Sequence, residues 1–114
     1  GRPQSQEWEY ILPLINYLRP RALIRIKANL NHHTDSMIEY DYHTDCGEYG
    51  MNDFEGATTA VFYLNTCDGY TFFKDGTKVN SVENRLVRFP VDTPHAGTST
   101  TDQKFRFVLN LNYF

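Results

Sequence analysis

Short runs in which hydrophobic and polar residues alternate dominate the chain after residue 21. Side chains two apart on an extended strand point to the same face, so this period predicts half-buried strands. The runs are rich in β-branched and aromatic residues and are separated by turn-forming Gly, Asp and Pro. The expected strands cover residues 22–31, 37–44, 57–66, 70–74, 77–80, 84–89 and 103–113. The pattern therefore predicts a mostly β protein.

Residues 7–18 carry the helical pattern of the chain. Hydrophobic residues recur there at helical spacing: Trp8, Ile11, Leu12, Ile15 and Leu18. This spacing predicts one amphipathic helix before the first strand. Pro13 is expected either to kink this helix or to begin its second part.

The last expected strand has a polar face as regular as its apolar face. The apolar face, expected to be core, comprises Phe105, Phe107, Leu109, Leu111 and Tyr113. The other face comprises Lys104, Arg106, Val108, Asn110 and Asn112. A simple sandwich would show these polar residues to water, whereas a barrel around a charged ligand would turn them inward. If Arg106 faces such an interior, Asn110 and Asn112 must face it too.

Composition limits the size and the partners of the protein. The 114 residues allow one domain, residues 1–114, with a helix at about 7–18 and a β core at about 22–114. Because 11 basic and 14 acidic residues give a net charge of -3, we expect no binding to nucleic acid. No stretch is long and apolar enough for a bilayer, so no membrane association is expected. Cys46 and Cys67 do not form a disulfide framework, and a cytoplasmic location is expected.

The first candidate for chemistry is His43-Thr44-Asp45, at the end of an expected strand. The H-x-D spacing lets both side chains reach one ion without bending the backbone. With His95 from a distant strand, the set is two imidazoles and one carboxylate. That ligand set leaves positions open on a non-haem iron. Alone, an H-x-D tripeptide or a histidine after a proline is more often an ordinary surface feature.

A second H-x-D motif, His33-Thr34-Asp35, competes with the first. It lies within a polar cluster, residues 31–36, that has turn chemistry and no apolar alternation. A loop fixes metal ligands less rigidly than a strand end does. We therefore favour His43 and Asp45 and expect the earlier motif to lie in a solvated loop.

Taken in order, these motifs resemble the iron(II)- and 2-oxoglutarate-dependent dioxygenases. They are His43-x-Asp45, residues 60–65, residues 85–89, His95 and Arg106. The resemblance covers about residues 22–114 and is closest to the prolyl-4-hydroxylase-like group, including small members encoded by marine bacteriophages. It implies a double-stranded β-helix, the jelly-roll (cupin-like) class of fold.

The resemblance also implies roles for single residues. His43, Asp45 and His95 would be the iron ligands. Arg106 would bind the distal carboxylate of 2-oxoglutarate, because a guanidinium can make two parallel charge-assisted hydrogen bonds to it. Lys104 is the rival for this role, since it shares the same strand face.

Other positions are matched less directly. The hydroxyl of Tyr63 would lie against the same carboxylate, with Thr59 on the same face of its strand. The alternative for Tyr63 is a core aromatic residue with one polar partner. Leu30 stands where relatives often have a tyrosine that holds the co-substrate. Asn110 and Asn112 are expected to contact the substrate.

The function implied by the resemblance is hydroxylation of an unactivated C–H bond with Fe(II), 2-oxoglutarate and O2, with ascorbate as a further requirement to test. Asp45 favours hydroxylation over halogenation, since halogenating relatives usually lack this carboxylate. The first substrate to consider is a prolyl residue in a protein or peptide, and a small-molecule substrate is the alternative. If the protein is encoded by a phage, its location would be the host cytoplasm. Two alternatives are a non-catalytic jelly-roll binding module and a cupin-type metalloenzyme that does not use 2-oxoglutarate.

Overall fold

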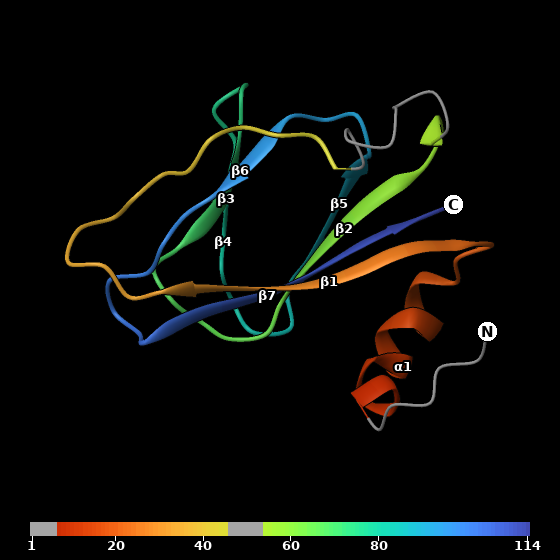
Figure 1. The fold of residues 1–114 in the computed structure, drawn as a ribbon, viewed down its shortest axis with the longest axis horizontal. Helices are drawn as coiled ribbons and strands as arrows, with labels where there is room; N and C mark the ends of the chain where they lie inside the picture. The colour runs from red at the N-terminus through yellow and green to blue at the C-terminus, as the bar shows by residue number, and fades with distance from the viewer. Residues whose placement is uncertain (1–6, 46–53) are drawn as a thin grey trace.

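The computed structural model describes residues 7–45 and 54–114. Two antiparallel sheets form the body of the molecule (Figure 1). The larger sheet has the strand order β1 (Leu23–His32), β7 (Phe105–Tyr113), β2 (Thr58–Tyr63) and β5 (Leu86–Pro90). The smaller sheet has the order β4 (Lys78–Asn80), β3 (Tyr70–Phe73) and β6 (His95–Gly97). The predicted mostly β fold with an N-terminal helix is confirmed.

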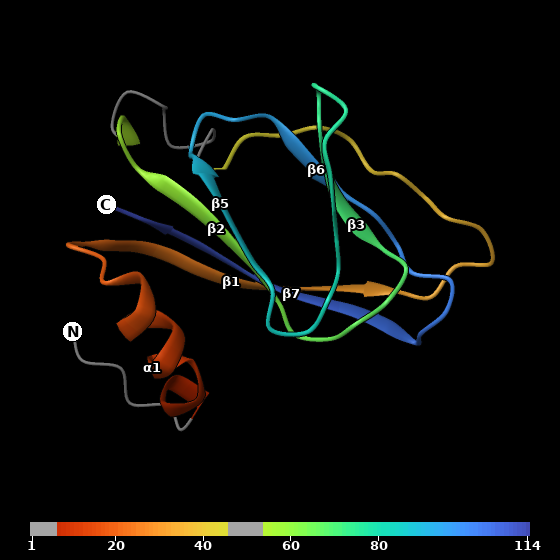
Figure 2. The same ribbon diagram turned by 180° about the vertical axis from the view of Figure 1, so that it is seen from behind.

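The helix α1 (Glu7–Leu18) lies against the outer face of the larger sheet, on the side away from the smaller sheet (Figures 1 and 2). Leu18 is buried there in a cluster with Ala60, Leu109 and Leu111. The helix ends at Leu18, and the next residue, Arg19, has a positive φ of 50° and donates its backbone N–H to the carbonyl of Ile15. This is a left-handed helix end, and the following Pro20 cannot continue the helix. Within the described residues, no helix is long and apolar enough to cross a membrane.

The apolar face of β7 is covered over only part of its length. Leu109, Leu111 and Tyr113 are buried in the cluster against α1, whereas Phe105 and Phe107 each keep 38% of their surface exposed. A 12-residue helix is roughly 18 Å long and a nine-residue strand roughly 30 Å, so α1 cannot cover all of β7. The prediction that all five residues are core is therefore wrong for Phe105 and Phe107.

The polar face of β7 turns inward, toward the smaller sheet. Arg106, Val108 and Asn112 are buried, and Asn110 is half-buried. Of the two readings of this face, the enclosed one is confirmed.

Strand β1 pairs with β7 and adds polar residues to the same interior face. Lys27, Asn29 and Asn31 lie opposite Asn110, Val108 and Arg106 in the antiparallel register. Leu30 instead lies opposite the outward-facing Phe107. At this end of β1 the inward-facing residues are therefore Asn29 and Asn31. They flank Leu30, the position at which relatives were expected to have a tyrosine.

The strand expected at residues 37–44 does not form as a continuous element. The segment lies beside residues 95–98 and pairs with them at isolated points, His43 with His95 in β6 and Glu39 with Thr98 just after it. Its partner β6 is only three residues long, so a regular ladder cannot extend along the whole segment. His95 was expected to come from a strand, but the expected strand ranges left out residues 95–97, because three residues are too few for a periodic pattern.

Candidate metal centre

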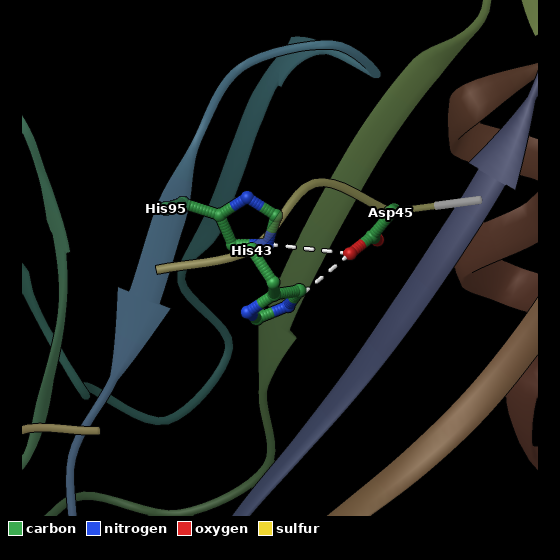
Figure 3. Close-up of side chains that lie close together, drawn as sticks. All are labelled: His43, Asp45 and His95. Carbon is green, nitrogen blue, oxygen red and sulfur yellow. Dashed lines mark ion pairs between the residues drawn. The ribbon is translucent and has the colours of Figure 1, made fainter. Parts of the chain in front are cut away.

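The structure brings His43, Asp45 and His95 together between the two sheets (Figure 3). His43 and His95 are paired backbone to backbone, each N–H donating to the other's carbonyl, at 2.9 and 3.0 Å. This pairing sets the imidazole rings side by side, with centroids 4.5 Å apart. Asp45 follows two residues later, and its Oδ1 lies 3.4 Å from the Nε2 of each histidine. One candidate ligand atom from each residue lies within 4.8 Å of the other two.

The three side chains differ in their access to solvent. Asp45 and His95 are buried, whereas 54% of the His43 side chain is exposed. The group is therefore open on the His43 side and closed on the side of the larger sheet.

The state of His95 shows that these residues fit a metal ion. Its Nδ1 lies 2.9 Å from the carbonyl oxygen of Thr93, and because a carbonyl only accepts, Nδ1 carries the proton. Its Nε2 is buried, has no hydrogen-bond partner among the described residues and faces the Asp45 carboxylate. In the neutral ring this nitrogen directs a lone pair at a negative charge, an arrangement that a cation between them would stabilise. Ligand atoms at ~2.1 Å from one ion and at right angles are ~3 Å apart, which is close to the 3.4 Å between Asp45 Oδ1 and each histidine Nε2.

Asp45 is held in its ionised form. Burial raises the pKa of its carboxyl, but the close contacts with His43 and His95 and the hydrogen bond from Asn112 outweigh burial, and the pKa lies well below its usual range. The contact with Asp45 raises the pKa of His43. A permanently ionised carboxylate next to two imidazoles is a donor set that suits Fe(II) and similar divalent ions.

Asn112 supports this carboxylate from the interior. It is fully buried, and its side-chain N–H2 group donates to Asp45 Oδ2 and to Thr59 Oγ1, both at 2.9 Å. Its Oδ1 accepts a bond from Arg25 Nε at 3.3 Å. The geometry assigns Asn112 to the candidate ligand Asp45 and leaves it no group for a substrate. Thr59 likewise lies beside Asp45, not at the other end of β2 with Tyr63.

Arg106 lies at the far end of the same cavity and is 2% exposed. Its Nε donates to Ser81 Oγ at 2.9 Å and its Nη2 to Thr71 Oγ1 at 3.3 Å. Burial lowers the pKa of Arg106, yet a guanidinium keeps its proton in proteins. No carboxylate of the described residues lies within 4.0 Å of it. A buried cation of this kind is best compensated by an anionic ligand.

Two neighbours complete the surroundings of this guanidinium. Its central carbon lies 5.8 Å from the ring centroid of Tyr63, whose hydroxyl donates to Thr71 Oγ1 at 2.7 Å. Burial raises the pKa of Tyr63, so the phenol is neutral. Lys104 is exposed and precedes β7, so Arg106 and not Lys104 lines the cavity.

Two glycines make room for Arg106, and sequence reasoning missed both. A Cβ atom at Gly69 would lie 2.5 Å from Arg106 Cδ and 2.6 Å from the carbonyl oxygen of Ser99. A Cβ atom at Gly97 would lie 3.2 Å from Arg106 Nη1. The position of Gly97, two residues after His95 and hence on the same strand face, was the signal that could have identified it.

A single cavity of about 270 Å3 joins the histidines to Arg106. Val61 and Val108 form an apolar stretch between its two polar ends. Asn110 also lines it, and the Oδ1 atom of Asn110 is buried without a hydrogen-bond partner. Asn110 thus stays a candidate for contact with a ligand. A larger hollow, about 730 Å3, lies beside residues 55–58 and 88–92 and contains none of the predicted site residues.

The competing motif lies elsewhere. His33 is exposed and its Nε2 contacts the carbonyl oxygen of Thr101 at 3.0 Å, which ties one loop to another. Asp35 is exposed, and in the part of the chain that the structure describes neither residue belongs to a group that could hold a metal. Cys67 is buried, and Cys46 lies outside the described residues.

Comparison with known proteins gives a likeness of fold. Neither a protein-family description nor a curated protein matches the chain. A cupin protein from Bacteroides fragilis is similar in structure over 88% of this chain and 72% of its own, with 10% identity and a TM-score of 0.53. A protein from Neisseria meningitidis matches over 98% of this chain and 100% of its own, with 13% identity and a TM-score of 0.51. An HTH_3 family transcriptional regulator from Vibrio cholerae matches with 16% identity and a TM-score of 0.48, and the chain spans 42% of its length. Together with the two sheets, the likeness to the cupin protein shows a jelly-roll β fold.

Proposed function

We propose that this protein is an Fe(II)- and 2-oxoglutarate-dependent oxygenase that hydroxylates an unactivated C–H bond. One observation carries the proposal. Two imidazoles and a carboxylate meet at one end of a cavity whose other end holds a buried guanidinium without an acidic partner among the described residues. The first set suits a metal with open positions, and the guanidinium suits a carboxylate.

His43, Asp45 and His95 would hold the iron. When bound, iron would supply the redox chemistry that couples oxidative decarboxylation of 2-oxoglutarate to insertion of one oxygen atom of O2 into a C–H bond. The protein's own residues would bind and orient the reactants and exclude side reactions.

The cavity has dimensions suited to a five-carbon dicarboxylate. Gly97 adjoins the Arg106 guanidinium and lies two residues along β6 from His95, a separation of ~6.6 Å. A 2-oxo acid chelating the metal would extend its far carboxylate over about this distance. Arg106 would bind that carboxylate, and the methylene groups would lie against Val61 and Val108.

The substrate would reach the metal from the exposed His43 side. A prolyl residue of a protein or peptide is the substrate we propose to test first, followed by small molecules. We also propose that the protein is cytoplasmic and does not act on nucleic acids. Ascorbate should be tested as an added reductant.

The rival function is that of a cupin-type metalloenzyme that does not use 2-oxoglutarate. The structural likeness to a cupin protein is compatible with either function, because the fold serves both classes. The two functions differ in their need for a buried cation in the same cavity as the metal. An enzyme that does not bind a dicarboxylate does not require one. Among the described residues, a binding module without metal would explain neither the missing hydrogen-bond partner of His95 Nε2 nor the missing acidic partner of the Arg106 guanidinium.

Anaerobic titration separates these functions. Fe(II) and 2-oxoglutarate together should produce the metal-to-ligand charge-transfer absorption of a chelated 2-oxo acid. His43→Ala should abolish this band, because it removes a metal ligand. His33→Ala, in the competing motif, is the matched control and should leave the band intact. Metal binding by the wild-type protein without this band on adding 2-oxoglutarate would favour the rival.

A further inference from the structure

The two carboxylate oxygens of Asp45 lie in different surroundings. Oδ1 faces both histidines, at 3.4 Å from each Nε2. Oδ2 points away from them and accepts a hydrogen bond from Asn112 Nδ2 at 2.9 Å. Only one of the two oxygens is therefore available on the side of the histidines.

The orientation of the Asn112 amide follows from its partners. Arg25 Nε can only donate, so the atom facing it is the amide oxygen. The N–H2 group must then face Asp45 and Thr59, which accept one hydrogen each. Asn112 is fully buried, and these three hydrogen bonds fix the orientation of its amide.

The number of oxygens that Asp45 offers decides how many positions stay open on a metal. Carboxylates bind metals through one oxygen or through both. In a six-coordinate site, two histidines and one carboxylate oxygen leave three positions. A chelating 2-oxo acid occupies two of these and dioxygen needs the third. A carboxylate that bound through both oxygens would leave one position too few.

We propose that Asn112 is a positioning residue that restricts Asp45 to one metal-facing oxygen and so preserves the position needed for a chelating 2-oxo acid and O2. This inference rests on the proposed function. Arg25 and Thr59 act through Asn112, since they hold its amide in the orientation that occupies Oδ2.

The decisive variant is Asn112→Leu, which keeps a side chain of similar size and removes both donors. We expect metal affinity to fall by ~10-fold, the low end of the cost of losing a hydrogen bond to a metal ligand, because the three ligands stay. The affinity for 2-oxoglutarate should fall by more than ~10-fold, because Asp45 can now use both oxygens. Both affinities are measured anaerobically, the first by Co(II) absorption and the second by the charge-transfer band of the Fe(II) protein.

Asn65→Ala is the matched control. Asn65 also makes hydrogen bonds with its side-chain amide, accepting from Phe107 N and donating to the carbonyl of Phe105. These bonds lie at the start of β7, away from Asp45. This variant should lose stability without a change in the ratio of the two affinities. A purely structural role for Asn112 would make Asn112→Leu behave in the same way.

The outcomes separate the two proposals. A wild-type protein that binds metal but gives no charge-transfer band overturns the proposed function and this inference with it. A wild-type band together with unchanged 2-oxoglutarate affinity in Asn112→Leu overturns this inference alone. If Asn112→Leu does not fold, Thr59→Val decides, because it removes one anchor of the amide at nearly constant size. A weaker binding of 2-oxoglutarate relative to metal in Thr59→Val supports the inference, and an unchanged ratio overturns it.

Discussion

At the scale of single residues, the fit of Arg106 between glycines sets a strict limit on what its neighbours can be. A methyl group at position 97 would lie 3.2 Å from Nη1, tighter than an ordinary contact, so the guanidinium would have to shift. Since Arg106 is held by two hydroxyls, a shift would also misalign those hydrogen bonds.

We expect Gly97→Ala to weaken 2-oxoglutarate binding on the order of 10-fold, because the misplaced guanidinium no longer matches the carboxylate. The measurement is the 2-oxoglutarate dependence of the anaerobic charge-transfer band. Gly76→Ala is the control: position 76 has a positive φ of 93° and no neighbour near an added Cβ, so it should cost stability but not affinity. Equal affinities in Gly97→Ala and wild type would contradict this account of the cavity.

Asp68 gives a pH-dependent contribution to stability that is separate from the candidate metal centre. Burial raises the pKa of its carboxyl, but hydrogen bonds from the backbone and hydroxyl of Thr101 and from Thr100 together outweigh burial, and the pKa is lowered. A lowered pKa in the folded state means stability that is present above the unfolded-state pKa of ~3.9. That stability is lost as the pH falls through the folded-state value.

Asp68→Asn should therefore lower the free energy of unfolding at pH 7 by about 1 kcal/mol or less, because the group is exposed. The difference from wild type should shrink as the pH falls below ~4. Urea unfolding at several pH values measures both quantities. A difference that stays constant down to pH 2 would show that the carboxylate charge is not involved.

At the scale of elements, α1 contributes packing and no site residue. Its buried Leu18 contacts the outer face of the larger sheet, whereas the candidate metal centre lies on the inner face. We expect Leu18→Ala to destabilise the fold by about 2–4 kcal/mol through lost burial and a cavity. Chemical denaturation checks the stability, and Co(II) titration should show unchanged metal affinity. Tyr17→Ala, at a position 68% exposed on the same helix, should change stability by less than ~0.5 kcal/mol.

Much of this level of structure could be predicted from the sequence. The alternation in β7 predicted which residues share a face, and the two-residue spacing of His43 and Asp45 predicted that they lie together. The segment 37–44 has the composition of a strand, but composition does not tell how long a partner is available to pair with it. The exposure of Phe105 and Phe107 depends on where α1 docks, which no local pattern encodes.

The roles of Asn112, Gly69 and Gly97 were beyond sequence reasoning for a different reason. Asn112 and Asp45 are 67 positions apart, and their hydrogen bond depends on the register between sheet and loop. The alternation of side chains along β7 placed Asn112 correctly on the interior face. It could not tell whether Asn112 would bond to Asp45 or to a substrate. Gly69 and Gly97 are needed because the side chain of Arg106, which comes from β7, passes close to both.

At the scale of the whole molecule, metal binding should be linked to folding. The three candidate ligands come from a loop and from β6, and the unfolded chain does not hold them together, so a metal would bind the folded state. A free metal concentration 100 times the Kd adds ~2.7 kcal/mol to the free energy of unfolding. In a domain of this size we expect a rise in Tm on the order of 10 °C.

Differential scanning calorimetry with Fe(II) or Co(II) under anaerobic conditions measures this rise, and a chelator should reverse it. Asp45→Asn should lose most of the increment, since it removes the only anionic ligand of the group. Asp35→Asn, in the competing motif, should keep it. An equal rise in Asp45→Asn and wild type would place the stabilising metal elsewhere.

The two ends of the cavity belong to different walls of the jelly roll, His95 to β6 and Arg106 to β7. A molecule bound at both ends would therefore link the two sheets. The length and stiffness of that molecule would limit how far the sheets can move apart. They would regain this freedom only after the molecule had dissociated.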